Sequence, residues 1–254
     1  MNVGKSDLAH YEKDGFLIVE NLVSPDEIKA LQDRLRDYTH GERDRGMAIF
    51  QTEPSVEQGE ITVEHPGDGI RKIGKLVQHD ALYRKLGSHP NILGVIETIL
   101  GPDIKLFRND ILVKPPGVGS AKSMHQDSPY WPIEPMSLCS CWFAIDDATV
   151  ENGCMGVLPG AHKLGPLAHT NVTGELTIEE ACYDLDDIIM APMKAGSGLF
   201  FHSLLPHYTA PNISDTWRRA IALSYMSSKH RYNGEGEGPE YFHIQGETFP
   251  GCVR

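Results

Sequence analysis

The second half of the sequence is a succession of short apolar segments separated by turn residues, and this pattern restricts the fold more than any other feature. The segments are rich in Val, Ile, Leu, Phe and Cys: IKLFRNDILVK (104–114), LCSCWFAID (138–146), CMGVLP (154–159), GSGLFFH (196–202) and RRAIALSYM (218–226). Most of the stretches between them lack the apolar periodicity of a helix. Strand–helix alternation and a G-x-G-x-x-G motif are both missing, which argues against a dinucleotide-binding fold. We therefore predict a mainly β protein: a cupin-like jelly roll, or double-stranded β-helix, made of two packed sheets.

Helices are expected to precede and flank this β region. Ser24-Pro25-Asp26-Glu27 has the form of a capping box with proline at the first helical position, so a helix should begin there. Ser6 is expected to cap an earlier helix that runs to Lys13 and stops at Gly15. Three further elements are predicted from apolar runs: a strand at FLIV (16–19) and helices at HDALYRKLG (79–87) and PNILGVIETIL (90–100).

A single domain is predicted over residues 1–254. Its expected parts are a mostly helical N-terminal portion (1–103), a jelly-roll core (104–230) and a C-terminal tail (231–254). Residues 41–70 are polar and show no clear periodicity, so they are expected to form a long surface loop or a lid over a substrate.

The charge and the cysteine content limit the classes of partner that the protein can bind and the cellular compartment that suits it. The chain carries a net charge of −12 and no large cluster of lysines and arginines, which argues against nucleic acid or an anionic membrane as the main partner. No run is apolar enough to span a membrane, and the N-terminal residues are too polar for a signal peptide. Five cysteines, an odd number without a C-x-x-C pair, suit reduced thiols. These features predict a cytoplasmic monomer or homodimer that acts on a small molecule.

Three histidines are followed two positions later by an acidic residue, a spacing that occurs at metal sites. With 12 histidines and 35 acidic residues in the chain, chance alone is expected to produce about two such triplets, so local structure must distinguish them. His10-Tyr11-Glu12 lies in a predicted helix, where side chains two positions apart point away from each other. His40-Gly41-Glu42 lies in a charged, glycine-containing segment after a helix. Only in His125-Gln126-Asp127, on a predicted strand, would the first and third side chains share a face, with Gln126 turned away.

Two ligands do not complete a metal site, so a third is expected from a distant strand. Six histidines follow residue 127 and are candidates: His162, His169, His202, His207, His230 and His243. His202 and His207 are an odd number of positions apart, so at most one of them faces the interior if the strand continues. Farther on, Arg218 shares a strand face with two alanines and a serine, which leave room for a ligand. A guanidinium in that place can bind a carboxylate through two parallel hydrogen bonds.

Four segments of the chain resemble one known family. They are YEKDGFLIVENLVSPDEI (11–28), HQD (125–127), DDATVENGCMGVLPGAHK (146–163) and FFHSLLPHYTAPNISDTWRRAIA (200–222). On these motifs the chain is similar to the phytanoyl-CoA dioxygenase family of Fe(II)- and 2-oxoglutarate-dependent oxygenases. The segments follow the family's order and cover nearly the whole chain.

The resemblance implies roles for individual residues. His125, Asp127 and His207 would bind Fe(II), with 2-oxoglutarate and O₂ as cosubstrates. The residues implied to contact 2-oxoglutarate are Arg218, at its C5 carboxylate, and Thr209, Trp142 and Lys72. The residues expected to contact the primary substrate are Gln126, Tyr130, Trp131 and Tyr208, which flank the ligands in the sequence.

The activity implied by the resemblance is hydroxylation of an aliphatic carbon of a small-molecule metabolite, with release of succinate and CO₂. Two alternatives stay open: a jelly-roll protein that binds a metal or ligand without turnover, and a halogenase. Asp127 disfavours the halogenase, because related halogenases have Gly or Ala in place of this carboxylate. A CoA thioester would require a basic surface, so a smaller, neutral or cationic substrate is expected for this acidic chain. An anionic group on the substrate stays open, because Lys122 and Arg108 could bind it.

Overall fold

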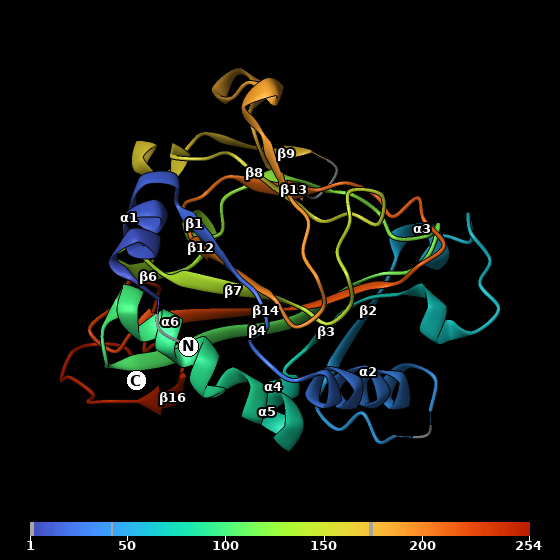
Figure 1. Ribbon diagram of the computed structural model, residues 1–254, viewed down its shortest axis with the longest axis horizontal. Helices are drawn as coiled ribbons and strands as arrows, with labels where there is room; N and C mark the ends of the chain where they lie inside the picture. The colour runs from blue at the N-terminus through green and yellow to red at the C-terminus, as the bar shows by residue number, and fades with distance from the viewer. Residues whose placement is uncertain (1–2, 42, 173–174) are drawn as a thin grey trace.

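Two β-sheets packed against each other form the body of the protein in the computed structural model, which describes residues 3–41, 43–172 and 175–254 (Figure 1). The larger sheet runs in the order β1 (Phe16–Val19), β12 (Gly198–His202), β7 (Cys139–Ala144), β14 (Arg218–Ser227), β4 (Ile104–Lys114), β3 (Ile70–Gly74) and β2 (Ile49–Thr52), and β16 (Phe242–Gln245) also pairs with β4. The smaller sheet runs in the order β11 (Ile189–Ala191), β8 (Met155–Val157), β13 (His207–Thr209) and β5 (Lys122–His125). This is the double-sheet arrangement predicted from the spacing of the apolar segments.

Helices lie on the side of the larger sheet that faces away from β8 and β13 (Figure 1). They are α2 (Pro25–Thr39), α4 (Leu76–His79), α5 (Ala81–Gly87) and α6 (Pro90–Leu100), while α1 (Lys5–Asp14) lies beside β1 and α3 (Pro54–Glu57) follows β2. The remaining pairs and turns are β9 (His169–Val172) with β10 (Glu175–Ile178), β6 (Ile133–Glu134) with β15 (Arg231–Tyr232), and the 3₁₀-helices η1 (Pro66–Gly69), η2 (Ser128–Tyr130), η3 (Ala161–Leu164), η4 (Glu180–Cys182) and η5 (Leu185–Asp187). Within the described ranges, no helix is both long and apolar enough to cross a membrane.

Alternate residues of the central strands face two separate cores. On β7, Phe143 packs in the core that the larger sheet shares with the helices, whereas Trp142 packs in the core between the two sheets. On β14, Leu223 packs in the core shared with the helices and Ala222 in the core between the sheets. Because side chains alternate along a strand, one sheet can be covered by helices on one face and by a second sheet on the other.

The predicted helix boundaries are largely confirmed. The Oγ of Ser24 accepts a hydrogen bond from the Glu27 N–H at 3.3 Å, and the Glu27 carboxylate accepts one from the Ser24 N–H at 3.1 Å, so the capping box is present. The prediction that Ser6 caps the first helix is wrong, because α1 begins at Lys5 with Gly4 as its N-cap. Asp7 makes this start favourable: its carboxylate accepts a hydrogen bond from the Gly4 N–H at 2.9 Å.

The prediction of a continuous loop over residues 41–70 is also wrong. β2 and β3 pair antiparallel, and β3 joins the sheet through β4. Ile70 and Ile73 are buried and anchor β3 in the core. The strand β2 carries no strong sequence signal, since its four residues are exposed or only half-buried. The consequence for the site is that Lys72, on β3, reaches the edge of the cavity described below.

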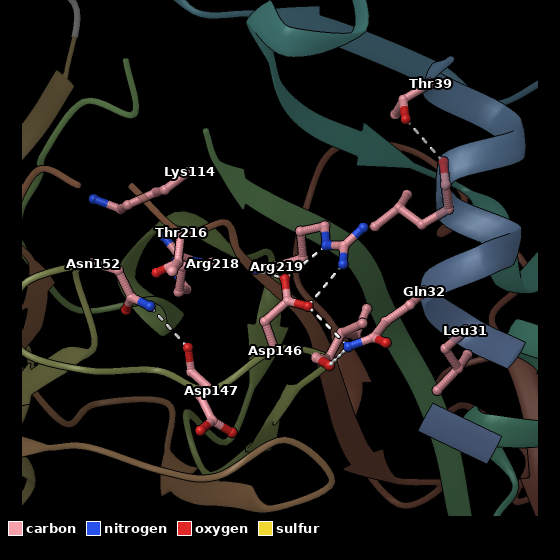
Figure 2. A network of polar contacts seen from close by, with 12 residues as sticks. Leu31, Gln32, Thr39, Lys114, Asp146, Asp147, Asn152, Thr216, Arg218 and Arg219 are labelled. Atoms are coloured by element: carbon pink, nitrogen blue, oxygen red, sulfur yellow. Dashed lines mark hydrogen bonds and ion pairs between the residues drawn. The ribbon is translucent and has the colours of Figure 1, made fainter. Parts of the chain in front are cut away.

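A polar network at the start of β14 fastens α2 to the sheet (Figure 2). The guanidinium of Arg219 donates two hydrogen bonds to the Asp146 carboxylate, from Nε at 2.6 Å and from Nη2 at 2.8 Å. Gln32 of α2 donates from Nε2 to Asp146 Oδ1 and to the Ile145 carbonyl, both at 3.0 Å. Arg219 is thereby held on the helix side of the sheet, so that its neighbour Arg218 faces the opposite side.

Removing the charge of Asp146 should destabilise the fold. We expect Asp146→Asn to lower the free energy of unfolding by about 2–4 kcal/mol, because it leaves the largely buried Arg219 guanidinium without its carboxylate. Denaturant titration measures this change. The matched control is the adjacent Asp147→Asn: Asp147 pairs with the exposed Lys194 at 2.6 Å, and loss of a surface pair should cost about 1 kcal/mol or less. Equal losses in the two variants would contradict this role of Asp146.

Candidate active site

Two neighbouring strands of the smaller sheet bring His125 and His207 together. β5 and β13 pair antiparallel with these two residues opposite each other, and the ring centroids are 4.2 Å apart. Asp127 follows β5, and its Oδ1 lies 3.9 Å from Nε2 of His125. One ligand atom from each of the three residues lies within 4.8 Å of the others, and in the described part of the chain this is the only such group of His, Cys, Asp or Glu.

Both histidines have their Nδ1 atoms engaged by the backbone. Nδ1 of His125 lies 2.8 Å from the Ser123 carbonyl oxygen, and Nδ1 of His207 lies 2.9 Å from the Leu205 carbonyl oxygen. A carbonyl can only accept, so Nδ1 carries the proton in both rings and Nε2 keeps its lone pair. Backbone carbonyls that fix the tautomer in this way are typical of histidines that ligate metals.

Burial keeps the two imidazoles neutral. It lowers the pKa of His125 well below 6.5, and the neighbouring His207 lowers it further. It also lowers the pKa of His207, although the carboxylate of Asp127 opposes that shift. Neutral imidazoles are the form that binds a metal ion, so little proton competition is expected near neutral pH.

Asp127 reaches the site for a different reason from the one predicted. β5 ends at His125, and the backbone N–H groups of Asp127 and Ser128 both donate to the Ser203 carbonyl at 3.0 Å. The chain therefore turns at this point instead of continuing as a strand. Gln126 points away from the site, as predicted, and is fully buried. Its side-chain amide donates to the Gly165 carbonyl at 2.9 Å and to the Leu204 carbonyl at 2.7 Å, and it accepts from the Leu167 N–H at 2.8 Å. The backbone therefore engages the side chain, and the expected contact of Gln126 with the substrate stays a prediction.

The other candidate histidines lie outside the group. His202 ends β12, and a turn separates it from His207, so the two do not share the continuous strand that their spacing suggested. Its ring centroid lies 5.2 Å from that of His162, and His169 packs edge-on against Tyr130. Of the other two triplets, His10 pairs with Asp14 at 3.0 Å, whereas Glu42 lies outside the described residues.

Arg218 lies at the start of β14 on the same side as this group. Its guanidinium sits over the ring of Trp142, with Cζ 5.3 Å from the ring centroid, and the side chain is 2% exposed. Nη1 donates to the Leu112 carbonyl at 3.3 Å, but among the described residues nothing accepts a hydrogen bond from Nε. Burial lowers the pKa of Arg218 to about 10. A buried cation with an unused donor is the environment that an anionic ligand would complete.

The triad and Arg218 line one cavity of about 130 Å³. The other residues expected to contact 2-oxoglutarate, Thr209, Trp142 and Lys72, line the same cavity. Lys72 is engaged by Asp110, with Nζ 3.0 Å from Oδ2.

Of the three aromatic residues expected to contact the primary substrate, one lines the cavity and two do not. Tyr208 lines the cavity. Trp131 instead packs against Phe107, with ring centroids 4.7 Å apart, and Tyr130 packs against His169; neither lines the cavity.

Five further charged residues line the cavity: Glu53, Arg71, Arg108, Lys114 and Lys122. Of these, only Arg108 and Lys122 are named from the sequence, for an anionic group. Arg108 and Lys114 are an even number of positions apart in IKLFRNDILVK, which places them on one face of a strand and is a signal that could have found both. With Lys72 and Arg218, six basic side chains line the cavity against the two carboxylates of Glu53 and Asp127. The net charge of −12, from which a neutral or cationic substrate was expected, therefore does not describe the lining of the cavity, because overall charge does not describe a local site.

The side chains present suit a non-haem iron and a dicarboxylate cosubstrate. Two imidazoles and one carboxylate on one side of an ion leave the remaining positions open, as in Fe(II) oxygenases. The freed Nε2 atoms of His125 and His207 supply the donor set. The unused Nε of Arg218 suits a carboxylate at the far end of a cosubstrate.

Comparison with known proteins supports this interpretation of the site. A family model described as Phytanoyl-CoA dioxygenase (PhyH) matches residues 11–220. The peroxisomal phytanoyl-CoA dioxygenase of Rattus norvegicus is 31% identical over 234 residues, which cover 87% of this chain and 68% of that protein. The human protein of the same name is 28% identical over 233 residues, again with 87% and 68% covered.

Solved structures share the fold at lower identity. The apo form of the non-haem monooxygenase ThoJ matches with a TM-score of 0.77 and 20% identity over 97% of this chain and 85% of that one. The epimerase SnoN, in complex with Fe³⁺, α-ketoglutarate and nogalamycin RO, matches with a TM-score of 0.72 and 19% identity over 98% and 97%. These likenesses confirm the predicted jelly-roll fold. From the family match and the relatives, the chain belongs to the phytanoyl-CoA dioxygenase family of iron- and 2-oxoglutarate-dependent oxygenases.

Proposed function

We propose that the protein hydroxylates an aliphatic carbon of a small-molecule metabolite, with His125, Asp127 and His207 as the Fe(II) ligands and Arg218 as the partner of the 2-oxoglutarate C5 carboxylate. The observation that carries the proposal is the meeting, in one cavity, of a three-ligand group with a buried arginine whose Nε is unused. A protein that only bound a metal would have no need of that arginine.

Each part of the cavity has a separate task. When bound, iron and 2-oxoglutarate supply the oxidising chemistry that consumes O₂ and releases succinate and CO₂. The histidine Nε2 atoms and the Asp127 carboxylate hold the metal. Thr209 and Lys72 assist Arg218 in orienting the cosubstrate, and Trp142 and Phe201 form an apolar wall that limits the access of water.

Two further features support the details of the proposal. The carboxylate of Asp127 would take the metal position that a halide needs, which favours hydroxylation over halogenation. All five cysteines are free thiols, and Cys139, Cys141 and Cys154 are buried. This is consistent with a reducing compartment, so we place the protein in the cytoplasm.

The metal role of His207 can be tested directly. Anaerobic protein mixed with Fe(II) and 2-oxoglutarate should develop a visible charge-transfer band, and His207→Ala should lose it. Its Fe(II) affinity should fall by more than about 100-fold, since even changes to outer partners of a ligand cost about 10- to 100-fold. The matched control is His243→Ala, which removes an exposed histidine on β16 and should keep the band. A band of full intensity in His207→Ala would refute the assigned ligand set.

The role of Arg218 can be tested by pairing a variant with a shortened ligand. Arg218→Ala should weaken 2-oxoglutarate binding by about 2–3 kcal/mol, or about 30- to 150-fold, because hydrogen bonds to a charged carboxylate are lost. 2-Oxobutanoate has the same chelating end but no C5 carboxylate, so the substitution should barely change its affinity. Titrating the charge-transfer band of both proteins with both ligands measures the four affinities. If the variant lost equal affinity for both ligands, Arg218 would not be the C5 partner.

A further inference from the structure

Arg108 places a second guanidinium beside the metal ligands. It lies on β4 with Asp110 on the same face of the strand, and its Nε pairs with Asp110 Oδ2. Its Nη1 lies 3.6 Å from Oδ1 of Asp127. The side chain is 30% exposed and lines the cavity. A cation this close to a metal site opposes metal binding unless another negative charge offsets it.

The carboxylates around Arg108 do not balance it once a metal is bound. Asp110 is shared, because Lys72 Nζ also lies 3.0 Å from the same oxygen. The negative charge of Asp127 would be shared with the metal, so Asp127 would offset Arg108 less once a metal is bound. Glu53 accepts hydrogen bonds from the backbone N–H of Ser120 at 3.2 Å and from its hydroxyl at 2.7 Å. One positive charge therefore remains in excess around Asp110.

Two of the other cavity cations, Arg218 and Lys114, have tasks of their own. Arg218 is assigned to the cosubstrate. Lys114 donates from Nζ to the carbonyls of the loops around it, Ser120 at 2.6 Å among them, so it fastens those loops together. Arg108 also lines the cavity, and it differs from both because its second carboxylate partner is a proposed metal ligand.

We infer that the primary substrate carries a carboxylate and that Arg108 binds it. The inference rests on the proposed function, since it assigns Asp127 to the metal. A planar guanidinium presents two parallel N–H groups that match the two oxygens of a carboxylate. Asp110 holds Arg108 through Nε, which leaves its Nη groups for a further partner. Because Nη1 is adjacent to a metal ligand, the carbon that is oxidised lies only a few bonds from the carboxylate.

A pair of small probes tests this without knowledge of the substrate. Fluoroacetate and fluoroacetamide have nearly the same size but differ in charge, and ¹⁹F relaxation reports their approach to a paramagnetic ion. The protein is first shown to form the Fe(II)–2-oxoglutarate band, then loaded with Mn(II) and N-oxalylglycine, an inert analogue of the cosubstrate. We expect fluoroacetate to be relaxed at least tenfold more strongly than fluoroacetamide at low ionic strength.

Variants then assign the effect to one side chain. Arg108→Gln should reduce the fluoroacetate effect at least tenfold while changing the affinity for 2-oxoglutarate less than threefold. Arg108→Lys keeps the charge but loses the planar pair of donors, so it should retain only part of the effect. The control Arg231→Gln, which removes an exposed arginine on β15, should leave it unchanged.

The outcomes separate this inference from the proposed function. Failure to form the Fe(II)–2-oxoglutarate band would overturn the proposed function itself. With the band present, equal relaxation of the two probes would overturn the inference alone. Strong fluoroacetate relaxation that persists in Arg108→Gln would show that the probe binds the metal or another cation. A loss of 2-oxoglutarate affinity with retained probe binding would assign Arg108 to the cosubstrate and also refute the inference.

Discussion

The register between β5 and β13 is the constraint on which the rest of the site depends. It places His125 opposite His207, although 82 positions separate them in the sequence. A shift of one residue would turn the side chains of one strand to the other face and separate the two imidazoles. Ser203 lies in the turn after β12, and its carbonyl accepts hydrogen bonds from the backbone at Asp127. This turn therefore fixes the bend that carries the third ligand. All three ligands are thus positioned by backbone interactions, which side-chain substitutions elsewhere in the cavity would leave intact.

The cavity interrupts the core between the sheets and holds charges that a core normally excludes. The inward face of β14 carries Ala220 and Ala222 beyond Arg218, and these small side chains leave the space that larger apolar residues would fill. Burying Arg218 and Asp127 costs desolvation free energy that their few partners only partly offset. Sites that bind charged ligands commonly accept such a cost, because the ligand supplies the missing partners. The stability needed to support this arrangement comes from the other core, where the sheet packs on the helices.

Two adjacent arginines show how the two faces of one strand divide these tasks. Arg219 faces the helices, and its Nε, Nη2 and backbone N–H all donate to the Asp146 carboxylate. Arg218 faces the cavity with one donor unused. The residue type is the same, and strand alternation alone decides which one stabilises the fold and which one is available to a ligand.

Local patterns in the sequence determined the element types, the capping of α2, the boundaries of α6 and the double-sheet class, because caps, turns and alternation act over a few residues. The same alternation assigned Arg218 and Arg219 to opposite faces, and motif resemblance singled out the residues of the triad. Tertiary structure alone decided that β2 and β3 extend the sheet, because four half-exposed residues form a strand only when a neighbour supplies hydrogen bonds. It also decided that Tyr130 and Trp131 pack away from the cavity, and that Arg108 lies beside Asp127. These outcomes depend on which distant strands become neighbours. The charge of the cavity likewise depends on which side chains those neighbouring strands bring together, and not on the composition of the whole chain.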